Sequence, residues 1–287
     1  MTTTPPRFSR PIAFFRLLRL NRTAMVALVA GASAYAAGAG AALSCWVVLA
    51  AWLLAVGGFS LDLWADRAAD SEGPRADLRH NPLSDGSLSP AAGLAFSTLC
   101  LLVSLVLTLT LVPRALPAWL AVGLVVAGLA AHRFETPLAR AITLGLLQAL
   151  YVWFGSLAGQ PSLGLFLLAG MFFFAMLGGR GRTDIRDFPQ DLPTSVQTLP
   201  KRYGIQRTAY LTAASLVIVF ALSLAAYATG EFNRVYLYLD LVFVAVGLLC
   251  AAWFAARPRP RLAYVLTLVF MMGTGSLICL AMVLGSR

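Results

Sequence analysis

Nine windows of about 20 predominantly apolar residues limit what this chain can fold into, because a helix of that length crosses about 30 Å of hydrocarbon. Hydrophobic residues make up 59% of the 287 residues, and charged residues make up only 12%, about half the usual fraction in soluble domains. Helices satisfy their own backbone hydrogen bonds in lipid, whereas membrane barrels show short alternating segments. The sequence therefore predicts an all-α polytopic membrane protein, with nine transmembrane helices in one bundle and a single domain over 1–287. The windows lie at about 23–40, 43–62, 90–112, 115–131, 138–158, 162–178, 208–228, 235–255 and 262–284.

The placement of Lys and Arg predicts the orientation of the bundle. Of the 22 basic residues, 19 precede the first window or follow an even-numbered one. By the positive-inside rule, the N-terminus and a polar cap lie in the cytoplasm and the C-terminus lies outside. The net charge of +10 then serves topology and attraction to anionic membrane lipid, so we expect no nucleic-acid partner. We expect an integral protein of a bacterial inner membrane.

Two long polar segments, at about 63–89 and 179–207, form the predicted cytoplasmic cap. Together with Asp62 they hold nine of the twelve acidic residues. In "DLWADRAAD" three carboxylates recur every four residues, and in "DIRDFPQD" they are spaced by three and four, so each triplet occupies one face of a helix. Pro189 lies inside the second window and predicts a kink, or a helix end before Asp191. The first triplet is Asp62, Asp66 and Asp70, and the second is Asp184, Asp187 and Asp191.

The two acidic triplets favour a metal site over a solvated surface. Carboxylates on one side of a small bundle repel one another, so a cation among them is required. Oxygen ligands without Cys or paired His suit Mg²⁺, which prefers one or two carboxylates together with phosphate oxygens and water. The alternative is a solvated helix end, in which the acids pair with neighbouring arginines, namely Arg67, Arg75, Arg182 and Arg186.

These motifs resemble those of the UbiA-type intramembrane prenyltransferases. The family's first motif reads N-x-x-x-D-x-x-x-D followed by R-P-L-x-x-G, and its second reads D-x-x-D-x-x-x-D followed by T-L-P-x-x-x-G. "DLWADRAAD…NPLSDGSLSP" and "DIRDFPQD…TLPKRYG" match most of these positions. The chain departs from the family at Asp62, where the family has Asn, and at Asn81, where it has Arg, with Arg79 as a nearby substitute.

The resemblance implies an activity and a set of site residues. Mg²⁺ ions bound by the six aspartates hold a prenyl diphosphate, cations neutralise the leaving group, and aromatic side chains wall the cavity. The isoprenyl group passes to a lipid, aromatic or other small acceptor. The candidate substrate-binding residues are Arg67, Arg79, Arg140, Arg186, Lys201, Trp64 and Tyr151.

Other functions stay open at this point. A terpene cyclase of the same fold, or a phosphoribosyl transfer to a polyprenyl phosphate, needs the same acidic motifs. A membrane transporter would need charged residues near the bilayer midplane, whereas here the acids gather at one interface. The sequence assigns no catalytic base, chain length, acceptor or oligomeric state.

Overall fold

The computed structural model describes residues 9–70, 81–131, 136–193, 196–269 and 275–286, and these residues are helical apart from the turns between them. Within those ranges the β structure is one isolated antiparallel bridge between Phe232 and Ser286. The all-α prediction is therefore confirmed for the described part of the chain. The helices are α1 (Arg10–Leu17), α2 (Leu20–Ala36), α3 (Ala41–Asp70), α5 (Pro90–Leu111), the 3₁₀ turn η2 (Pro113–Ala115), α6 (Leu116–Ala130), α7 (Pro137–Ser156), α8 (Leu163–Asp191), α9 (Leu199–Tyr203), α10 (Ile205–Ala228), α11 (Arg234–Ala256), α12 (Pro260–Leu268) and α13 (Gly275–Gly285).

Seven of the described helices are long and apolar enough to cross a membrane. They correspond to the second to eighth predicted windows. These helices are α3, α5, α6 together with the preceding η2 turn, α7, α8, α10 and α11. The first window corresponds to α2, which has only 17 residues and starts three residues earlier than expected. The ninth window contains α12 and α13, and residues 270–274 between them lie outside the described ranges. Nine membrane crossings and the orientation of the termini therefore stay predictions.

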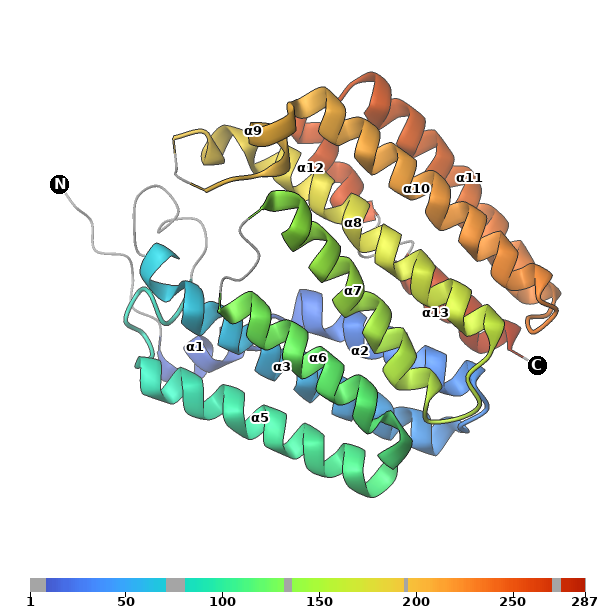
Figure 1. The fold of residues 1–287 in the computed structure, drawn as a ribbon, viewed down its shortest axis with the longest axis horizontal. Coiled ribbons are helices and arrows are strands. Elements are labelled where there is room, and N and C mark those ends of the chain that lie inside the picture. The colour runs from blue at the N-terminus through green and yellow to red at the C-terminus, as the bar shows by residue number, and fades with distance from the viewer. Residues whose placement is uncertain (1–8, 71–80, 132–135, 194–195, 270–274, 287) are drawn as a thin grey trace.

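The helices form two apolar cores that share α2 and α7 (Figure 1). One core joins these two helices to α3 and α6, and the other joins them to α8, α10, α11 and α13. Val26 and Ala30 of α2 belong to the first core, whereas Val29 belongs to the second. In α7, Tyr151 belongs to the first core and Val152 belongs to the second. Because helical neighbours point about 100° apart, one helix presents different faces to both cores.

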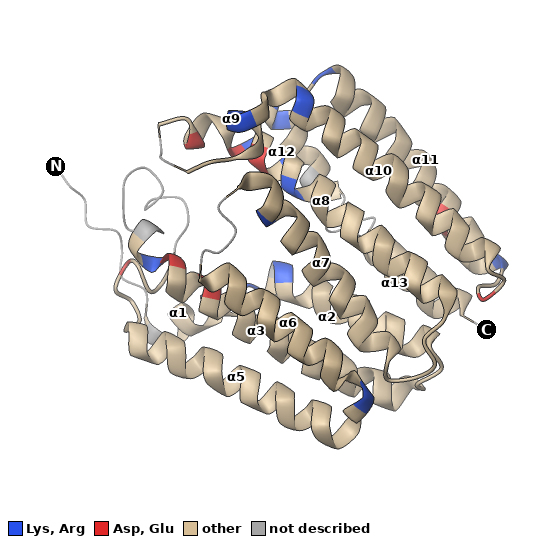
Figure 2. Cartoon of the chain, in the orientation of Figure 1, with Lys and Arg blue, Asp and Glu red and all other residues tan. Residues whose placement is uncertain are grey.

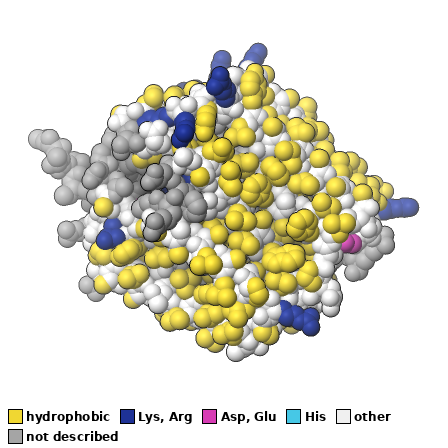
Figure 3. All heavy atoms as spheres, viewed as in Figure 1, with side chains coloured by type: hydrophobic (Ala, Val, Ile, Leu, Met, Phe, Trp, Pro, Cys, Tyr) yellow, Lys and Arg dark blue, Asp and Glu magenta, His cyan; other side chains and the backbone are white. Residues whose placement is uncertain are grey.

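The outer surface is largely apolar between the two ends of the bundle. Figure 3 shows hydrophobic side chains over the middle of one face, with Lys and Arg at its edges. Large apolar side chains are exposed along α5 and α11, among them Leu99, Val106, Leu249 and Trp253. Soluble monomers rarely expose contiguous apolar patches of more than a few hundred Å², so this surface is suited to hydrocarbon.

Charged side chains gather at one end of the bundle (Figure 2). This end holds the C-terminal turns of α3 and α8 and the start of α7. Of the two outcomes predicted for Pro189, a kink or a helix end before Asp191, the helix end is wrong, because α8 continues through both residues. Pro189 lies in the last turn, where only one intrahelical hydrogen bond is lost, and the Leu192 N–H still donates to the Phe188 carbonyl (3.1 Å). The second acidic triplet is therefore carried on one continuous helix.

Candidate active site

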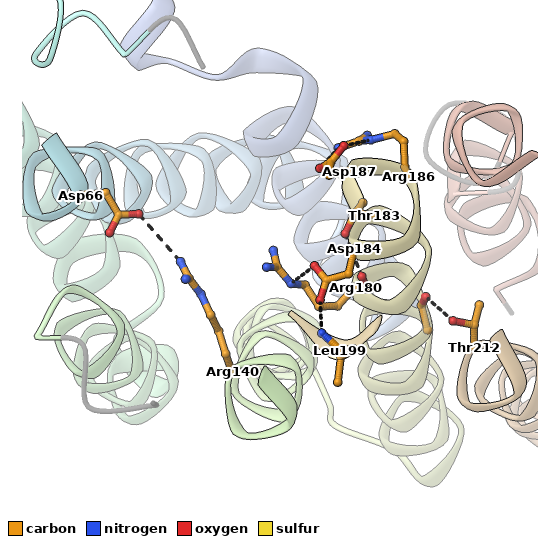
Figure 4. A network of polar contacts seen from close by, with 10 residues as sticks. Asp66, Arg140, Arg180, Thr183, Asp184, Arg186, Asp187, Leu199 and Thr212 are labelled. Carbon is orange, nitrogen blue, oxygen red and sulfur yellow. Dashed lines mark hydrogen bonds and ion pairs between the residues drawn. The ribbon is translucent and has the colours of Figure 1, made fainter. Parts of the chain in front are cut away.

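The last two turns of α3 form one side of the charged end. Asp62 and Asp66 are half-buried and lie one helical turn apart on the same face. The Asp66 carboxylate lies 3.8 Å from the guanidinium of Arg140 (Oδ2 to Nη2), which projects from the first turn of α7 (Figure 4). Thr136 caps α7, because its hydroxyl accepts from the Ala139 N–H (3.1 Å), and so fixes where this turn begins. The Asp70 side chain and the whole of Arg79 fall outside the described structure.

The last three turns of α8 form the other side. Arg180 and Asp184, four residues apart, make an ion pair of 2.9 Å between Nε and Oδ1. The second oxygen of Asp184 accepts from the Leu199 N–H of α9 (3.1 Å). Arg186 donates to both oxygens of Asp187, at 2.6 and 2.7 Å. Asp191, at the end of the helix, is buried.

Arg22 joins the two sides from α2. It lies within electrostatic range of Asp62 on α3 and of Arg180 and Arg186 on α8, although its side chain is exposed. The charged end is therefore surrounded by α2, α3, α7 and α8, with Arg140 and Arg180 between the two acidic helices (Figure 4).

Three candidate substrate-binding residues lie outside this arrangement. The Arg67 guanidinium donates to the Trp64 carbonyl (2.5 Å) and stacks 4.3 Å from the centre of the Trp64 ring. Trp64 in turn packs against a small apolar cluster that includes Leu17 of α1 and Leu83. Tyr151 is buried in the first core, 11 residues beyond Arg140 on α7 and so about 16 Å deeper. Arg67 and Trp64 therefore contact each other, and Tyr151 lies far from the paired charges.

Lys201 lies on α9, the short helix that covers the end of α8. Its ammonium donates to the carbonyl of Val196 (3.0 Å). Because α9 packs against α7, α8 and α10, the lysine belongs to the same charged end as Arg140 and Arg180. Its position agrees with the expected diphosphate-facing role without testing it.

The sequence reasoning gave no site role to Arg22 or Arg180. For Arg180 a signal existed, because it precedes Asp184 by four residues, the spacing of a helical ion pair. Arg22 gave no such signal, since it belongs to a run of five N-terminal arginines that also carries the topology.

The donor set fits a hard cation such as Mg²⁺. Asp66 and Asp187 supply carboxylate oxygens from two helices, and their side chains are 15% and 37% exposed. In the ranges that the structure covers, no three His, Cys, Asp or Glu side chains form a ready-made cluster. Mg²⁺ prefers one or two carboxylates completed by phosphate oxygens and water, so carboxylates from two helices suit it.

The comparison with known proteins agrees with this architecture. Digeranylgeranylglyceryl phosphate synthase of Natronomonas pharaonis is 27% identical over 179 residues, which cover 60% of this chain and only 62% of that protein. A solved structure described as digeranylgeranylglyceryl phosphate synthase in membranes matches with a TM-score of 0.75 and 20% identity, covering 96% of this chain and 98% of the other. A UbiA homologue from Archaeoglobus fulgidus, solved with DMAPP and Mg²⁺, matches with a TM-score of 0.70 and 16% identity over 92% and 98% of the two chains.

The structural matches are below 25% identity and establish the shared fold. The sequence itself matches the UbiA prenyltransferase family over residues 23–282, which is nearly the whole chain. Those residues include both aspartate motifs, the whole of α3, α7 and α8, and α2 from Thr23 onward. The chain therefore belongs to the UbiA prenyltransferase family.

Proposed function

We propose that this protein is a Mg²⁺-dependent intramembrane prenyltransferase that moves an isoprenyl group from a prenyl diphosphate to a lipophilic acceptor. The observation that carries the proposal is that two acidic helix ends, on α3 and α8, lie at the same end of the bundle with the side chains of Arg140 and Arg180 between them. Such a mixture of carboxylates and guanidiniums suits a metal–diphosphate complex, because the acids hold the metal and the arginines hold phosphate oxygens. The complex of the Archaeoglobus fulgidus homologue with DMAPP and Mg²⁺ supports the same donor and metal.

We assign the metal to the accessible carboxylates. Asp62 and Asp66 on one helix and Asp187 on the other would hold it. Asp70 and the buried Asp191 are added to the set from their places in the two motifs alone. When bound, Mg²⁺ supplies positive charge to the diphosphate oxygens as the carbon–oxygen bond breaks. The protein's own part is to hold that metal from two rigid helices and to exclude bulk water from the allylic carbon.

The cations at this end would bind the diphosphate. Arg140 and Arg180 would donate to non-bridging diphosphate oxygens, and Lys201 on α9 would approach from the cap. The bond electrons leave with the diphosphate, so these donors stabilise the charge that grows on it. The acceptor then supplies an electron pair to the allylic carbon and loses a proton, for which we assign no protein base.

The isoprenyl chain would extend from this end into the apolar interior. Tyr151 lies about 16 Å deeper along α7, at the depth that the hydrocarbon chain reaches and beyond the reach of the diphosphate. Trp64 and Arg67 bind each other beside the α1 cluster, and we assign them a packing role. The name digeranylgeranylglyceryl phosphate synthase, shared by two of the matched proteins, supports a lipid acceptor.

We further propose that the whole chain is one domain that crosses a bacterial inner membrane nine times, with the charged end in the cytoplasm. The basic residues at this end, with few at the other, support that orientation. The short α2 and the pair α12 and α13 would supply the first and ninth crossings, next to the seven long helices.

A direct assay tests the function. Purified protein is incubated with isotope-labelled prenyl diphosphates of several lengths and an extract of lipid acceptors, with Mg²⁺ or with EDTA, and diphosphate release and products are measured. We expect Mg²⁺-dependent prenylation, and Asp66→Asn and Asp187→Asn each to lower the rate by about 10²–10³-fold. Asp85→Asn is the matched control, because an amide oxygen still accepts from the Ser87 N–H (2.8 Å).

Each of the other outcomes has a distinct meaning. Cyclised hydrocarbon formed without an acceptor would indicate a terpene cyclase. In a parallel incubation with phosphoribosyl diphosphate and polyprenyl phosphate, turnover of that donor, with none of the prenyl diphosphates consumed, would indicate phosphoribosyl transfer. If no donor is consumed in a Mg²⁺-dependent way, the proposed function is wrong.

A further inference from the structure

Asp184 differs from the other described aspartates of the charged end that carry an ion pair. Its side chain is only 4% exposed, compared with 15% for Asp66 and 37% for Asp187. Both of its oxygens already have donors: Oδ1 pairs with Arg180 Nε at 2.9 Å, and Oδ2 accepts from the Leu199 N–H at 3.1 Å. Asp187 also has donors on both oxygens, from Arg186, but it is 37% exposed, so water and a metal can reach it. The buried carboxylate of Asp184, one of whose donors is a backbone N–H, is poorly suited to Mg²⁺, which keeps several waters and needs oxygens about 2.0–2.1 Å away.

The Leu199 N–H has a specific reason to need Asp184. Leu199 is the first residue of α9, and the first N–H groups of a helix have no partner within that helix. Thr198 stands at the N-cap, but its side chain makes no capping hydrogen bond. Asp184 therefore caps α9 from a different helix, 15 residues earlier in the chain, and its negative charge also suits the N-terminal end of the helix.

The same point of the fold is fixed by packing. The Leu199 side chain is fully buried in an apolar cluster with Ala141 of α7 and Leu177 of α8. The Leu199 backbone is thus bonded to α8, which carries Arg180, and its side chain packs against both α8 and α7, the helix that carries Arg140. Two residues later α9 presents Lys201, so the position of the lysine depends on this attachment.

We propose that Asp184 is a positioning residue that attaches α9 to α8, and with it Lys201, while it also orients the Arg180 guanidinium toward the diphosphate. Metal binding is left to the more accessible aspartates, Asp187 above all. The roles of Lys201 and Arg180 toward the diphosphate rest on the proposed function. The attachment of α9 to α8 does not, because it is a property of the free protein.

The experiment compares three variants of the full-length protein in detergent, without Mg²⁺ or substrate, by hydrogen–deuterium exchange of peptides covering 196–204. Asp184→Ala removes both acceptors, so we expect exchange in this segment to rise about tenfold or more. Asp184→Asn keeps one oxygen for the Leu199 N–H and should exchange nearly as the wild type does. Asp187→Asn should leave the segment unchanged.

A second measurement separates positioning from metal binding. Mn²⁺ affinity in the presence of inorganic pyrophosphate is measured by electron paramagnetic resonance. We expect Asp187→Asn to weaken Mn²⁺ binding by about 10–100-fold and Asp184→Asn to change it by less than about threefold. In Asp184→Asn the KM for prenyl diphosphate should rise, because Arg180 loses its charged partner.

The possible failures are distinguishable. Equal loss of Mn²⁺ affinity in Asp184→Asn and Asp187→Asn would make Asp184 a metal ligand and overturn the proposal. Unchanged exchange of 196–204 in Asp184→Ala would overturn it as well. If the protein consumes no prenyl diphosphate, the proposed function fails, but the exchange measurement still decides whether Asp184 holds α9.

Discussion

The contact between α2 and α7, which joins the two cores, depends on glycine. A Cβ placed on Gly155 would lie 2.0 Å from the carbonyl oxygen of Ala30 and 2.8 Å from its carbonyl carbon. Four residues later, a Cβ on Gly159 would lie 2.2 Å from the carbonyl oxygen of Ala37. Small residues spaced by four let the backbones of membrane helices approach closely. We therefore expect Gly155→Ala to force the two helices apart.

The size of the effect follows from which atoms collide. The atoms that a methyl group at Gly155 would meet are backbone atoms of Ala30, so no side-chain rotation relieves the contact and the helices must separate by about 1 Å or more. Overpacking of this kind costs about 1–3 kcal/mol. At about 2–4 °C per kcal/mol, the Tm should fall by roughly 2–12 °C. Because α2 also carries Arg22, near Asp62, prenyl transfer should fall too.

The assay is thermal unfolding of the purified variants in the same detergent, followed by intrinsic fluorescence. Gly123→Ala in α6 is the matched control, since its Cβ would meet only the Trp119 ring, at an ordinary 3.9 Å. We expect the control to melt within about 2 °C of the wild type, or above it, because Ala favours helix more than Gly does. If Gly155→Ala melts as high as Gly123→Ala, the close packing of α2 against α7 is not as described and the reasoning fails.

Two further predictions concern single polar contacts. Glu231 accepts from the Ser162 hydroxyl and from the Gly164 N–H (3.1 Å) at the start of α8, so Glu231→Gln should lower the stability by about 1 kcal/mol in the same unfolding assay, and an unchanged Tm would contradict this role. Arg140→Gln removes a guanidinium that pairs with Asp66 and is proposed to bind diphosphate, so the KM for prenyl diphosphate should rise about 10–100-fold with a smaller change in Tm than for Gly155→Ala; a KM that stays within twofold would exclude Arg140 from the donor site.

Most of the fold was predictable because length and hydropathy decide it. Seven apolar windows became seven helices, since a run of about 20 apolar residues has little alternative to helix in hydrocarbon. The shared faces of the acidic residues were predictable for a similar reason, because spacings of three and four place side chains on one side of any helix. The start of α2 was not predictable from the sequence. The chain turns at Arg19, where φ is +44°, and nothing in the local sequence pattern marks that turn.

The partners of the acidic residues were harder to predict than their positions. Asp184 looks like Asp187 in the sequence, and only the fold brings the Leu199 N–H to one of them. That contact depends on how the chain returns over the end of α8, which no periodicity encodes. Arg22 is a similar case, because its charge has the same effect on topology wherever it points, and its place near Asp62 arises from the packing of α2 on α3.

Three aspartates of the two motifs form ion pairs with arginines of the same end. These pairs bear on how the proposed site would accept a metal ion and a prenyl diphosphate. Asp66 pairs with Arg140, and Asp187 pairs with Arg186, so each of these partly exposed acids has an arginine beside it. A cation entering alone would have to displace an arginine, and a diphosphate entering alone would have to displace a carboxylate. On the proposed function, when both enter together, each carboxylate would exchange an arginine for the metal and each arginine would exchange a carboxylate for phosphate, so the charges would stay balanced. Metal and prenyl diphosphate should therefore each strengthen the binding of the other, as linkage requires.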